Sequence, residues 1–460
     1  MRPLMPMAFL LACHPSDGLT IVGPTDADTD TVTQPPPPPP PPPTPTTDGT
    51  TDTDPDTDTY SPTDTDTDDP TGTDTDTITP PPTEPSDEPI PDIIVDCEGG
   101  ADYESIQAAI NNSVSGDLIH VMPCIYRERL DLDAKTVEIV GVGGSAVTII
   151  DAEQAGTVID IELGEGLGMR IAGFTVTGGL DDVEGAGMEV NQSVIEMEDV
   201  VFTGNEGFNI IHAFGGMIDL HNVHIVGNDI SGGDGSGIYA KGGGLSVSDS
   251  VIDCDNGLNG LWHHNSLVMS DTTITCLEGY ALHDYHGEDQ IRRCKLIGGL
   301  AGIYAYDTEP TDEEPDTPSE RLWVYNTVAV GAIGIDMRWM DATIINSIAV
   351  GETSAISFLD GNPSLIENTL AMGAACGLTV VGTSVTTNYN ATWDNDAPGC
   401  GAALDAVVNT DPMFVNYPDD LHLMAGSPLI DAGEPGAAAG DADGTPNDIG
   451  IYGGKLPYED

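Results

Sequence analysis

The chain has 460 residues, with 77 acidic against 12 basic side chains, so its formal net charge at pH 7 is -65. A field of this sign repels phosphate groups and argues against nucleic acid and anionic membrane surfaces as partners. Aromatic residues make up only 5% of the chain, while glycine occurs 55 times. This composition favours a thin core of small aliphatic side chains.

The first thirteen residues, MRPLMPMAFLLAC, combine an early arginine with a short apolar run that ends at Cys13. The pattern resembles a bacterial lipoprotein signal, in which the cysteine is lipidated and becomes the mature N-terminus. The run is too short to span a bilayer, which takes about 20 apolar residues. We therefore expect a signal peptide at 1–13, lipidation of Cys13, and a protein anchored by lipid at the bacterial outer membrane or cell surface. A plain secretory leader is the alternative.

Residues 14–92 are mainly Thr, Asp and Pro, with an unbroken proline run at 35–43. This segment has too few apolar side chains to form a core, so we expect a disordered stalk. Calcium chelation by its alternating Asp residues is the less favoured interpretation, because a flexible run has no preformed site. The segment holds 19 acidic residues, which leaves 58 acidic and 11 basic residues in 93–460, a net charge of about -47.

An amphipathic helix is predicted over residues 103–113, where Ile106, Ala109 and Ile110 fall on one helical face. A helix in this position would cover the exposed edge of the first strands that follow it. Its role is structural.

A sequence motif of about 22 residues repeats between Gly187 and Leu378. Its first apolar residue recurs at steps of 21 to 23, apart from one step of 32 that holds an insertion at 307–320. The aligned residues are Ile238, Leu261, Leu282, Ile303, Ile335, Ile356 and Leu378. A second column keeps the same phase and consists of Asp199, Asn222, Asp249, Asp271, Arg293, Asn326, Asn346, Asn368 and Asn388.

Within each repeat, polar and apolar residues alternate over four or five positions, which predicts short β-strands. One such unit cannot bury its apolar face alone, so successive units must stack into a solenoid. Asn and Asp tolerate the left-handed backbone conformation and can hydrogen-bond the amides of a turn. We therefore expect one turn to carry a stack of Asn222, Asp249, Asp271, Asn326, Asn346 and Asn368.

The segment DYESIQAAINNSVSGDLIHVMPCIYRERLDLDAKTVEIVG resembles the cap helix and first coil of pectin methylesterases. On the basis of this segment and the repeat, residues 93–454 resemble the right-handed parallel β-helix proteins of the pectate-lyase-like superfamily. The resemblance implies an all-β fold, a single right-handed solenoid with a short N-terminal cap helix, followed by a tail at 455–460. It carries no activity, because the chain lacks the esterase Asp-Phe and Arg-Pro-Trp segments and the pectate-lyase Asp-His and Arg-x-Pro-x-x-Arg elements.

Eight cysteines fit an oxidising compartment. Cys254 and Cys276 each lie five residues beyond an Asp of the second column, so adjacent coils bring them within disulfide reach. The predicted disulfides are Cys97–Cys124 at the cap, Cys254–Cys276, and Cys376–Cys400 in the last coil, with Cys294 left over.

The alternation also predicts which side chains face outward on five adjacent coils. If the aligned apolar residues face inward, the residues one and three positions later face outward. These residues are Tyr239, Trp262, His283, Tyr304 and Asp336 in one column, and Lys241, His264, Tyr285, Tyr306 and Arg338 in the other. At about 4.8 Å per coil the patch is about 20 to 25 Å long, the length of a short oligosaccharide. In the coils beyond it we expect less distinctive residues in these columns, among them Glu189, Ile211, Ser357 and Thr379.

Aromatic faces stack on sugar rings and neighbouring polar groups bind hydroxyls, so this pattern predicts a polysaccharide-binding site. The insertion at 307–320 would wall one side of it. The carbohydrate-binding candidates are Tyr239, Lys241, Trp262, Tyr304 and Tyr306. The alternative is an aromatic ladder that only stabilises the sheet.

Three possibilities remain open for this site: glycoside hydrolysis, β-elimination, and binding without chemistry. Glycoside hydrolysis needs two carboxylates, for which Asp336 is a candidate together with Asp307 or an acid of the insertion. β-Elimination needs a cation and a base, although the charge of the domain opposes an anionic substrate unless calcium bridges the two. The catalytic candidates are His264, His283, Tyr285, Asp336 and Arg338.

Near the C-terminus, Asp441, Asp443 and Asp448 place oxygen ligands at the tight spacing of a calcium loop. An Asp/Gly turn that seals the last coil is the alternative. Taken together, the sequence predicts a monomeric, lipid-anchored β-helix that binds polysaccharide, with calcium as the candidate cofactor. The competing hypothesis is a structural or adhesive surface protein that uses the solenoid as a rigid spacer.

Overall fold

We describe a computed structural model, which defines residues 92–458 except 133–134, 163–167, 255, 308–320, 402–406, 437–439 and 456. The chain divides into two compact units, and the described residues all belong to the second, Pro85–Asp460. The predicted leader with Cys13, the Thr/Asp/Pro segment up to residue 91, and all of the insertion but Asp307 lie outside the described residues. Among the residues that are described, no helix has the length and apolarity of a candidate membrane span.

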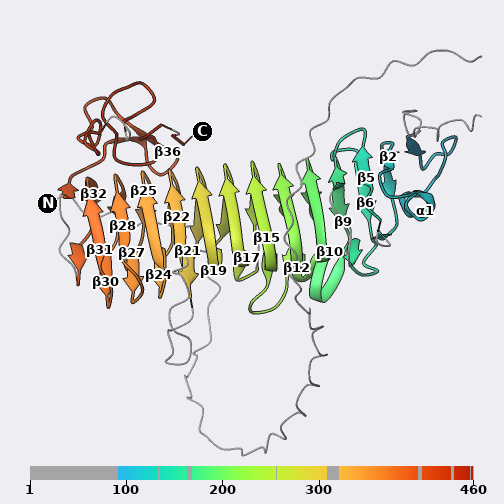
Figure 1. Cartoon of the computed structure of the whole chain (residues 1–460), viewed down its shortest axis with the longest axis horizontal. Coiled ribbons are helices and arrows are strands. Elements are labelled where there is room, and N and C mark those ends of the chain that lie inside the picture. Colours follow the sequence, from blue (N-terminus) through green and yellow to red (C-terminus); the bar gives the residue numbers. More distant parts are fainter. Residues whose placement is uncertain are drawn as a thin grey trace, which may run out of the picture. The chain divides into compact units, whose positions relative to one another are not determined.

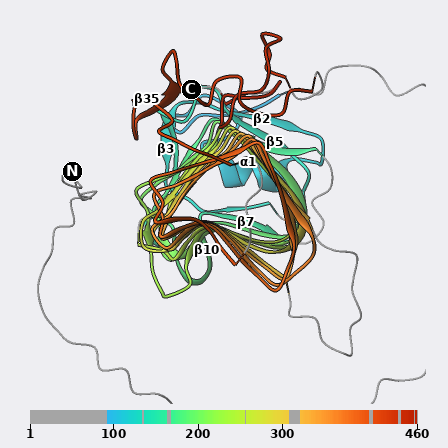
Figure 2. The same ribbon diagram turned by 90° about the vertical axis from the view of Figure 1, so that its left-hand side faces the viewer.

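The fold is the predicted parallel β-helix, in which strands of successive coils pair along one axis (Figure 1). Viewed along this axis, the coils superpose in a roughly triangular outline (Figure 2). The larger sheet contains β1 (Ile93–Val95), β2 (Leu118–Val121), β4 (Leu130–Asp131), β5 (Glu138–Gly141), β7 (Ile159–Glu162), β8 (Met169–Ala172), β10 (Leu180–Glu198), β12 (Glu206–His221), β14 (Asp229–Ile230), β15 (Ser236–Ser248), β17 (Asn259–Ser270), β19 (Tyr280–Arg292), β21 (Ala301–Tyr306), β22 (Arg321–Tyr325), β24 (Ile333–Arg338), β25 (Asp341–Ile345), β27 (Ser354–Leu359), β28 (Ser364–Glu367), β30 (Cys376–Val381), β31 (Val385–Asn388) and β33 (Ala397–Cys400).

The smaller sheet forms another face of the coils. It contains β3 (Cys124–Tyr126), β6 (Thr148–Asp151), β9 (Thr175–Thr177), β11 (Val201–Phe202), β13 (His224–Ile225), β16 (Val251–Asp253), β18 (Thr273–Cys276), β20 (Lys295–Gly298), β23 (Val328–Val330), β26 (Ile348–Val350), β29 (Leu370–Met372), β32 (Asn390–Trp393) and β34 (Val407–Asn409). A separate antiparallel pair consists of β35 (Phe414–Asn416) and β36 (Asp420–Leu423). The helix of the described chain is α1 (Ile106–Asn112).

Two faces of each coil belong to the larger sheet because its long strands continue round a corner. The first part of β19 pairs with β21, and its last five residues pair with β22. A long strand therefore presents inward side chains on two faces that meet at an angle, and residues of both faces can approach each other inside the solenoid.

The predicted core column is confirmed. Its members pair in register from coil to coil and are at most 2% exposed: Ile238, Leu261, Leu282, Ile303, Ile335, Ile356 and Leu378. Each coil buries its apolar side chains against the coils before and after it, which is why a single repeat has no core of its own.

The predicted turn ladder is confirmed as well. Positive φ values of 47 to 55° occur at Asp199, Asn222, Asp249, Asp271, Arg293, Asn326, Asn346 and Asn368. The amide of a ladder residue donates to a carbonyl of the next coil, for example Asn222 N to Ser248 O at 3.0 Å. The last coil differs by one residue, because Tyr389 and not Asn388 has the positive φ, of 51°.

The cap helix α1 covers the first coils with Ile106, Ala109 and Ile110, which are fully buried. Ser105 caps the helix by accepting a hydrogen bond from Ala108 N at 3.1 Å. Glu128, in the first coil, accepts from the Ser105 hydroxyl at 2.6 Å and from the amide of Ile106 at 2.8 Å. The carboxylate thus neutralises the positive end of the helix dipole and fixes the helix to the solenoid.

All three predicted disulfides are present, and each links neighbouring parts of the solenoid: Cys97–Cys124, Cys254–Cys276 and Cys376–Cys400. Cys294 is free and buried. Burial raises the pKa of its thiol to about 12, so it stays protonated and unreactive at neutral pH.

The paired coils end at β34, and the following residues pack against the outer face of the smaller sheet. Leu429, Ile449 and Ile451 join Ile348 and Leu370 in a second apolar cluster. The turn ladder supplies polar contacts to the same segment. These are Asn326 Nδ2 to Ile451 O at 2.9 Å, Asn346 Nδ2 to Asn447 Oδ1 at 2.7 Å, and Glu434 N to Asn368 Oδ1 at 2.8 Å.

Candidate functional site

The two predicted outward columns exist. Strand pairing aligns Tyr239, Trp262, His283, Tyr304 and Asp336 in the first, and Lys241, His264, Tyr285, Tyr306 and Arg338 in the second. We call these ten residues the aromatic patch. The strands β15, β17, β19, β21 and β24 hold them on one face of the larger sheet.

The rings of the patch contact each other along the coil axis. Trp262 and His283 are stacked, with centroids 4.9 Å apart and an interplanar angle of 2°. Tyr280, at the start of β19, stacks on Tyr304 at 4.8 Å, although it lies outside the two predicted outward columns. Neighbouring rings therefore occupy part of each other's faces, and the half-buried rings offer a ligand chiefly their edges and hydroxyl groups. This differs from the face-on stacking expected from sequence.

The expected position of Ile211 was wrong by one residue. Ile211 pairs with Ile238 and is fully buried, so the outward residue of that coil is His212, which pairs with Tyr239. The His212 and Tyr239 rings are stacked with centroids 5.2 Å apart. The ring column thus extends one coil further toward the N-terminus than the sequence predicted.

Beyond His212 the same column turns acidic. Glu189 pairs with His212, Asp160 with Glu189, and Asp131 with Asp160. Glu162, two residues after Asp160, lies in the adjacent outward column on β7. We call Asp131, Asp160, Glu162 and Glu189 the acidic row. His212 links this row to the aromatic patch, since it pairs with Glu189 on one side and with Tyr239 on the other.

Two carboxyl groups of the acidic row have different surroundings. Glu189 is 4% exposed and its carboxylate accepts a hydrogen bond from His212 Nδ1 at 2.7 Å. Burial, with smaller contributions from Glu162 and the other acids of the row, raises the pKa of Asp160 to about 6. One oxygen of Asp160 is buried and has no hydrogen-bond partner among the described residues. Asp160 is therefore suited to hold a proton near neutral pH, and Glu189 is held in place by an imidazole.

Four rings of the patch, those of Tyr239, Tyr304, Tyr306 and His283, are uncharged at neutral pH. Burial raises the pKa of Tyr239, Tyr304 and Tyr306 above the usual value near 10, so their hydroxyls stay protonated. Burial also lowers the pKa of His283 to about 4. These four side chains can consequently form hydrogen bonds with a ligand without carrying charge.

Asp336 and Arg338 form a compensated pair at one end of the patch. Asp336 is 3% exposed and accepts from Arg338 Nη2 at 2.8 Å. The guanidinium lies over the Tyr304 ring, 5.1 Å from its centroid. The pairing positions both side chains.

The proposed catalytic histidines are constrained by their neighbours. His283 Nδ1 lies 2.8 Å from Asn259 Oδ1, to which it donates, and its Nε2 is buried. His264 packs edge-on against Tyr285, with centroids 4.9 Å apart. A substrate would have to displace a neighbouring ring to reach His283 Nε2, so the geometry favours a binding role for this part of the patch.

The three C-terminal aspartates accept hydrogen bonds from their own loop. Asp441 accepts from Gly454 N at 2.6 Å, Asp443 from Thr445 N at 2.9 Å, and Asp448 from Asp431 N at 2.7 Å. Among the described residues they do not form a group whose ligand atoms all lie within 4.8 Å of one another. Calcium binding here stays a prediction.

No protein-family model matches the chain, and no curated protein matches its sequence. Among solved structures, pectate lyase Pel9A aligns with a TM-score of 0.45 and 12% identity over 80% of this chain and 98% of its own. The A-module of the mannuronan C-5 epimerase AlgE6 from Azotobacter vinelandii gives 0.38 and 13% over 67% and 94%. Pectin methylesterase from carrot gives 0.24 and 10% over 70% and 88%. These similarities carry no argument about what this chain binds.

Proposed function

We propose that the β-helix binds polysaccharide through the aromatic patch. The observation that carries the proposal is the concentration of aromatic side chains. The chain has only 24 Phe, Trp and Tyr residues, and six of them lie on four adjacent strands of one face: Tyr239, Trp262, Tyr280, Tyr285, Tyr304 and Tyr306.

The charge balance of the patch favours an uncharged glycan. Tyr239, Tyr304 and Tyr306 are protonated, Arg338 is compensated by Asp336, and Lys241 adds one formal positive charge, whereas residues 93–460 carry a net charge of about -47. A polyanion would be repelled by this surrounding field. A neutral sugar chain can instead bind to ring edges and phenol hydroxyls, which supply hydrogen bonds next to apolar surface.

A glycan array with the purified protein tests the proposal, followed by Trp262→Ala and Tyr304→Ala on any glycan that is bound. Loss of an aromatic contact costs about 1 kcal/mol, or roughly a fivefold increase in Kd. Trp323→Ala is the matched control, because Trp323 lies on β22, away from the patch, beneath Arg321. Equal binding by all three variants would place the glycan site elsewhere. If the parent protein binds no glycan, the rigid-spacer hypothesis is preferred.

A second candidate function is hydrolysis of the bound glycan by the acidic row. It is favoured by the contrast between Asp160, with its pKa near 6, and Glu189, which His212 holds. A carboxyl group that holds its proton near neutral pH can act as the acid, and Glu189, oriented by His212, is the candidate nucleophile. The two residues pair directly on adjacent strands, which lie about 4.8 Å apart. Carboxyl groups separated by about 5 to 5.5 Å hydrolyse glycosides with retention of the anomeric configuration.

Asp160→Asn and Glu189→Gln test this second candidate. Each should abolish release of reducing sugar from a glycan that the parent protein cleaves, while retention on the aromatic patch persists. Asp219→Asn, an exposed aspartate outside the row, should keep full activity. Undiminished hydrolysis by both row variants would exclude this assignment.

The cellular setting remains part of the proposal. We infer a monomer that is anchored through a lipidated Cys13 at the bacterial outer membrane or cell surface, on the strength of the N-terminal sequence alone. Calcium binding by Asp441, Asp443 and Asp448 is proposed separately, and equilibrium dialysis with calcium tests it.

A further inference from the structure

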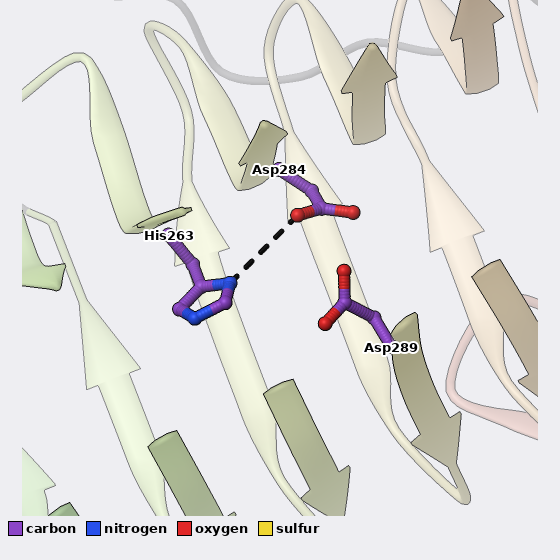
Figure 3. A group of neighbouring side chains, drawn as sticks. All are labelled: His263, Asp284 and Asp289. Carbon is purple, nitrogen blue, oxygen red and sulfur yellow. Dashed lines mark ion pairs between the residues drawn. The ribbon is translucent and has the colours of Figure 1, made fainter. Parts of the chain in front are cut away.

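Three polar side chains meet inside the solenoid, where every neighbouring coil has apolar residues. His263 lies on β17, and Asp284 and Asp289 lie on β19 (Figure 3). All three are fully buried. Their ligand atoms all lie within 4.8 Å of one another.

The cluster interrupts two columns of the core. In one inward column, Ala240 pairs with His263 and Asp284 pairs with Ala305. In the other, Asp289 pairs with Leu322 and its Oδ1 accepts a hydrogen bond from Leu267 N at 2.5 Å. The small residues on either side of His263 and Asp284 leave room around them, and the corner of β19 brings Asp289 to the same place.

Hydrogen bonds from the described residues leave two members of the cluster, His263 and Asp284, unsatisfied. Both ring nitrogens of His263 and both carboxylate oxygens of Asp284 are buried without a hydrogen-bond partner among the described residues. His263 Nδ1 and Asp284 Oδ1 point toward each other across 3.8 Å (Figure 3). At 3.8 Å this ion pair of a protonated His263 is too long for a hydrogen bond. Burying a carboxylate whose oxygens accept no hydrogen bond costs several kcal/mol, so this arrangement calls for a compensating ligand.

We propose that His263, Asp284 and Asp289 bind a divalent transition metal ion, Zn²⁺, inside the β-helix. One imidazole nitrogen and carboxylate oxygens form a mixed donor set that suits Zn²⁺, whereas Ca²⁺ and Mg²⁺ prefer oxygen ligands alone. Two carboxylates and a neutral imidazole carry two negative charges, which the ion neutralises. The ion would tie β17 to β19 and join the two faces that meet at the corner.

Zinc binding requires the ligand atoms of the three side chains to move only slightly closer together. Ligand atoms of a tetrahedral zinc site with bonds of about 2 Å lie about 3.3 Å apart, compared with the 4.8 Å that encloses this cluster. Rotations of side chains between Ala240 and Ala305 can bring the atoms closer. Because the site is enclosed, the ion should enter during folding and exchange slowly afterwards.

The test uses the full chain, unfolded in denaturant with EDTA and refolded with or without Zn²⁺. After gel filtration, the parent protein should retain one zinc ion per chain more than Asp289→Leu, as measured by elemental analysis. That substitution extends the Leu267 and Leu322 column, so it is expected to fold. Any zinc held by the acidic N-terminal segment is common to both proteins. His221→Ala, which disrupts an exposed His221–Asp249 pair, should retain the ion.

Two further measurements make the result independent of any single variant. The parent protein refolded with Co²⁺ should show visible absorption typical of nitrogen and oxygen ligands, without the near-ultraviolet band of a thiolate. Its melting temperature should rise with zinc, and that of Asp289→Leu should not. Equal zinc content in the parent protein and Asp289→Leu would overturn the proposal, as would a parent protein that refolds without binding zinc or cobalt.

Discussion

The environment of each side chain on this solenoid depends on whether it points inward or outward and on the residues aligned with it in the two adjacent coils. Asp160 shows how much a neighbour matters, because burial and the acids aligned with it raise its pKa to about 6. An aspartate with an ordinary pKa near 3.8 would be fully ionised at pH 7. The folded protein therefore binds a proton at Asp160 more readily than the unfolded chain does, and the ionised form opposes folding.

Asp160→Asn should accordingly stabilise the protein at high pH. Since the folded pKa is raised, the destabilisation by Asp160 is complete above pH 6 and disappears as the pH falls toward 4. Allowing for partial solvent screening, we expect a gain of about 1 to 2 kcal/mol at pH 8 and none at pH 4. Denaturant unfolding at both pH values measures it, with Asp219→Asn as the control. A gain that is the same at pH 4 and pH 8 would contradict the assigned cause.

The alternation of residues within the repeat predicted most of this residue-level detail. It placed Trp262, His283 and Tyr304 in one outward column because each follows an inward aliphatic residue. It failed at His212, because Ile210 and Ile211 are both apolar and either could begin the inward column. A slip of one residue moves every side chain of a strand to the opposite face.

The same alternation also indicates two members of the buried cluster of His263, Asp284 and Asp289. His263 and Asp284 lie two residues after Leu261 and Leu282, and are therefore inward positions occupied by polar residues. Asp289 could not be assigned to the cluster from sequence. The corner within β19 separates it from Asp284, and only the path of the backbone shows that the two side chains meet.

At the scale of elements, the short helix α1 depends on a contact with the first coil, which is distant from it in the sequence. The helix has only seven residues, too few to be stable alone. Its N-terminal amides are satisfied by Glu128, which lies more than twenty residues away in the chain. Glu128 thus has a structural role in seating the helix.

Glu128→Ala should loosen the helix without unfolding the solenoid. It removes charge-assisted hydrogen bonds from the Ser105 hydroxyl and from two helix amides, at a cost of about 2 kcal/mol. Hydrogen exchange should accelerate at 106–110 and remain slow in the central coils. Arg127→Ala is the control, since its ion pair with Glu153 is exposed and contributes little. Unchanged exchange in the helix of Glu128→Ala would show that Glu128 does not hold it.

At the scale of the whole molecule, the described domain is one solenoid, and the N-terminal sequence predicts how it is attached. The lipoprotein hypothesis rests on MRPLMPMAFLLAC and the strongly polar residues that follow it. Neither the fold nor the aromatic patch depends on it. Attachment and binding can therefore be tested separately.

Cys13→Ser should move the protein from the membrane fraction to the soluble fraction of cells that express it. Lipid on this cysteine supplies the expected attachment, and the other seven cysteines lie within residues 97–400. Fractionation and immunoblotting measure the change, and Cys294→Ser serves as a control that keeps the predicted lipid site. If Cys13→Ser stays with the membrane, another means of attachment is responsible.

The three disulfides determine how the domain resists mechanical tension. A solenoid held only by contacts between adjacent coils can unravel from an end, one coil at a time. Cys97–Cys124 closes the first coil, Cys376–Cys400 closes the last, and Cys254–Cys276 fastens two coils near the middle. Each link takes the residues between its two cysteines out of the length that tension can extend. Cys254–Cys276 encloses β17, so a pull along the chain would pass through this bond and leave Trp262 and His264 in place.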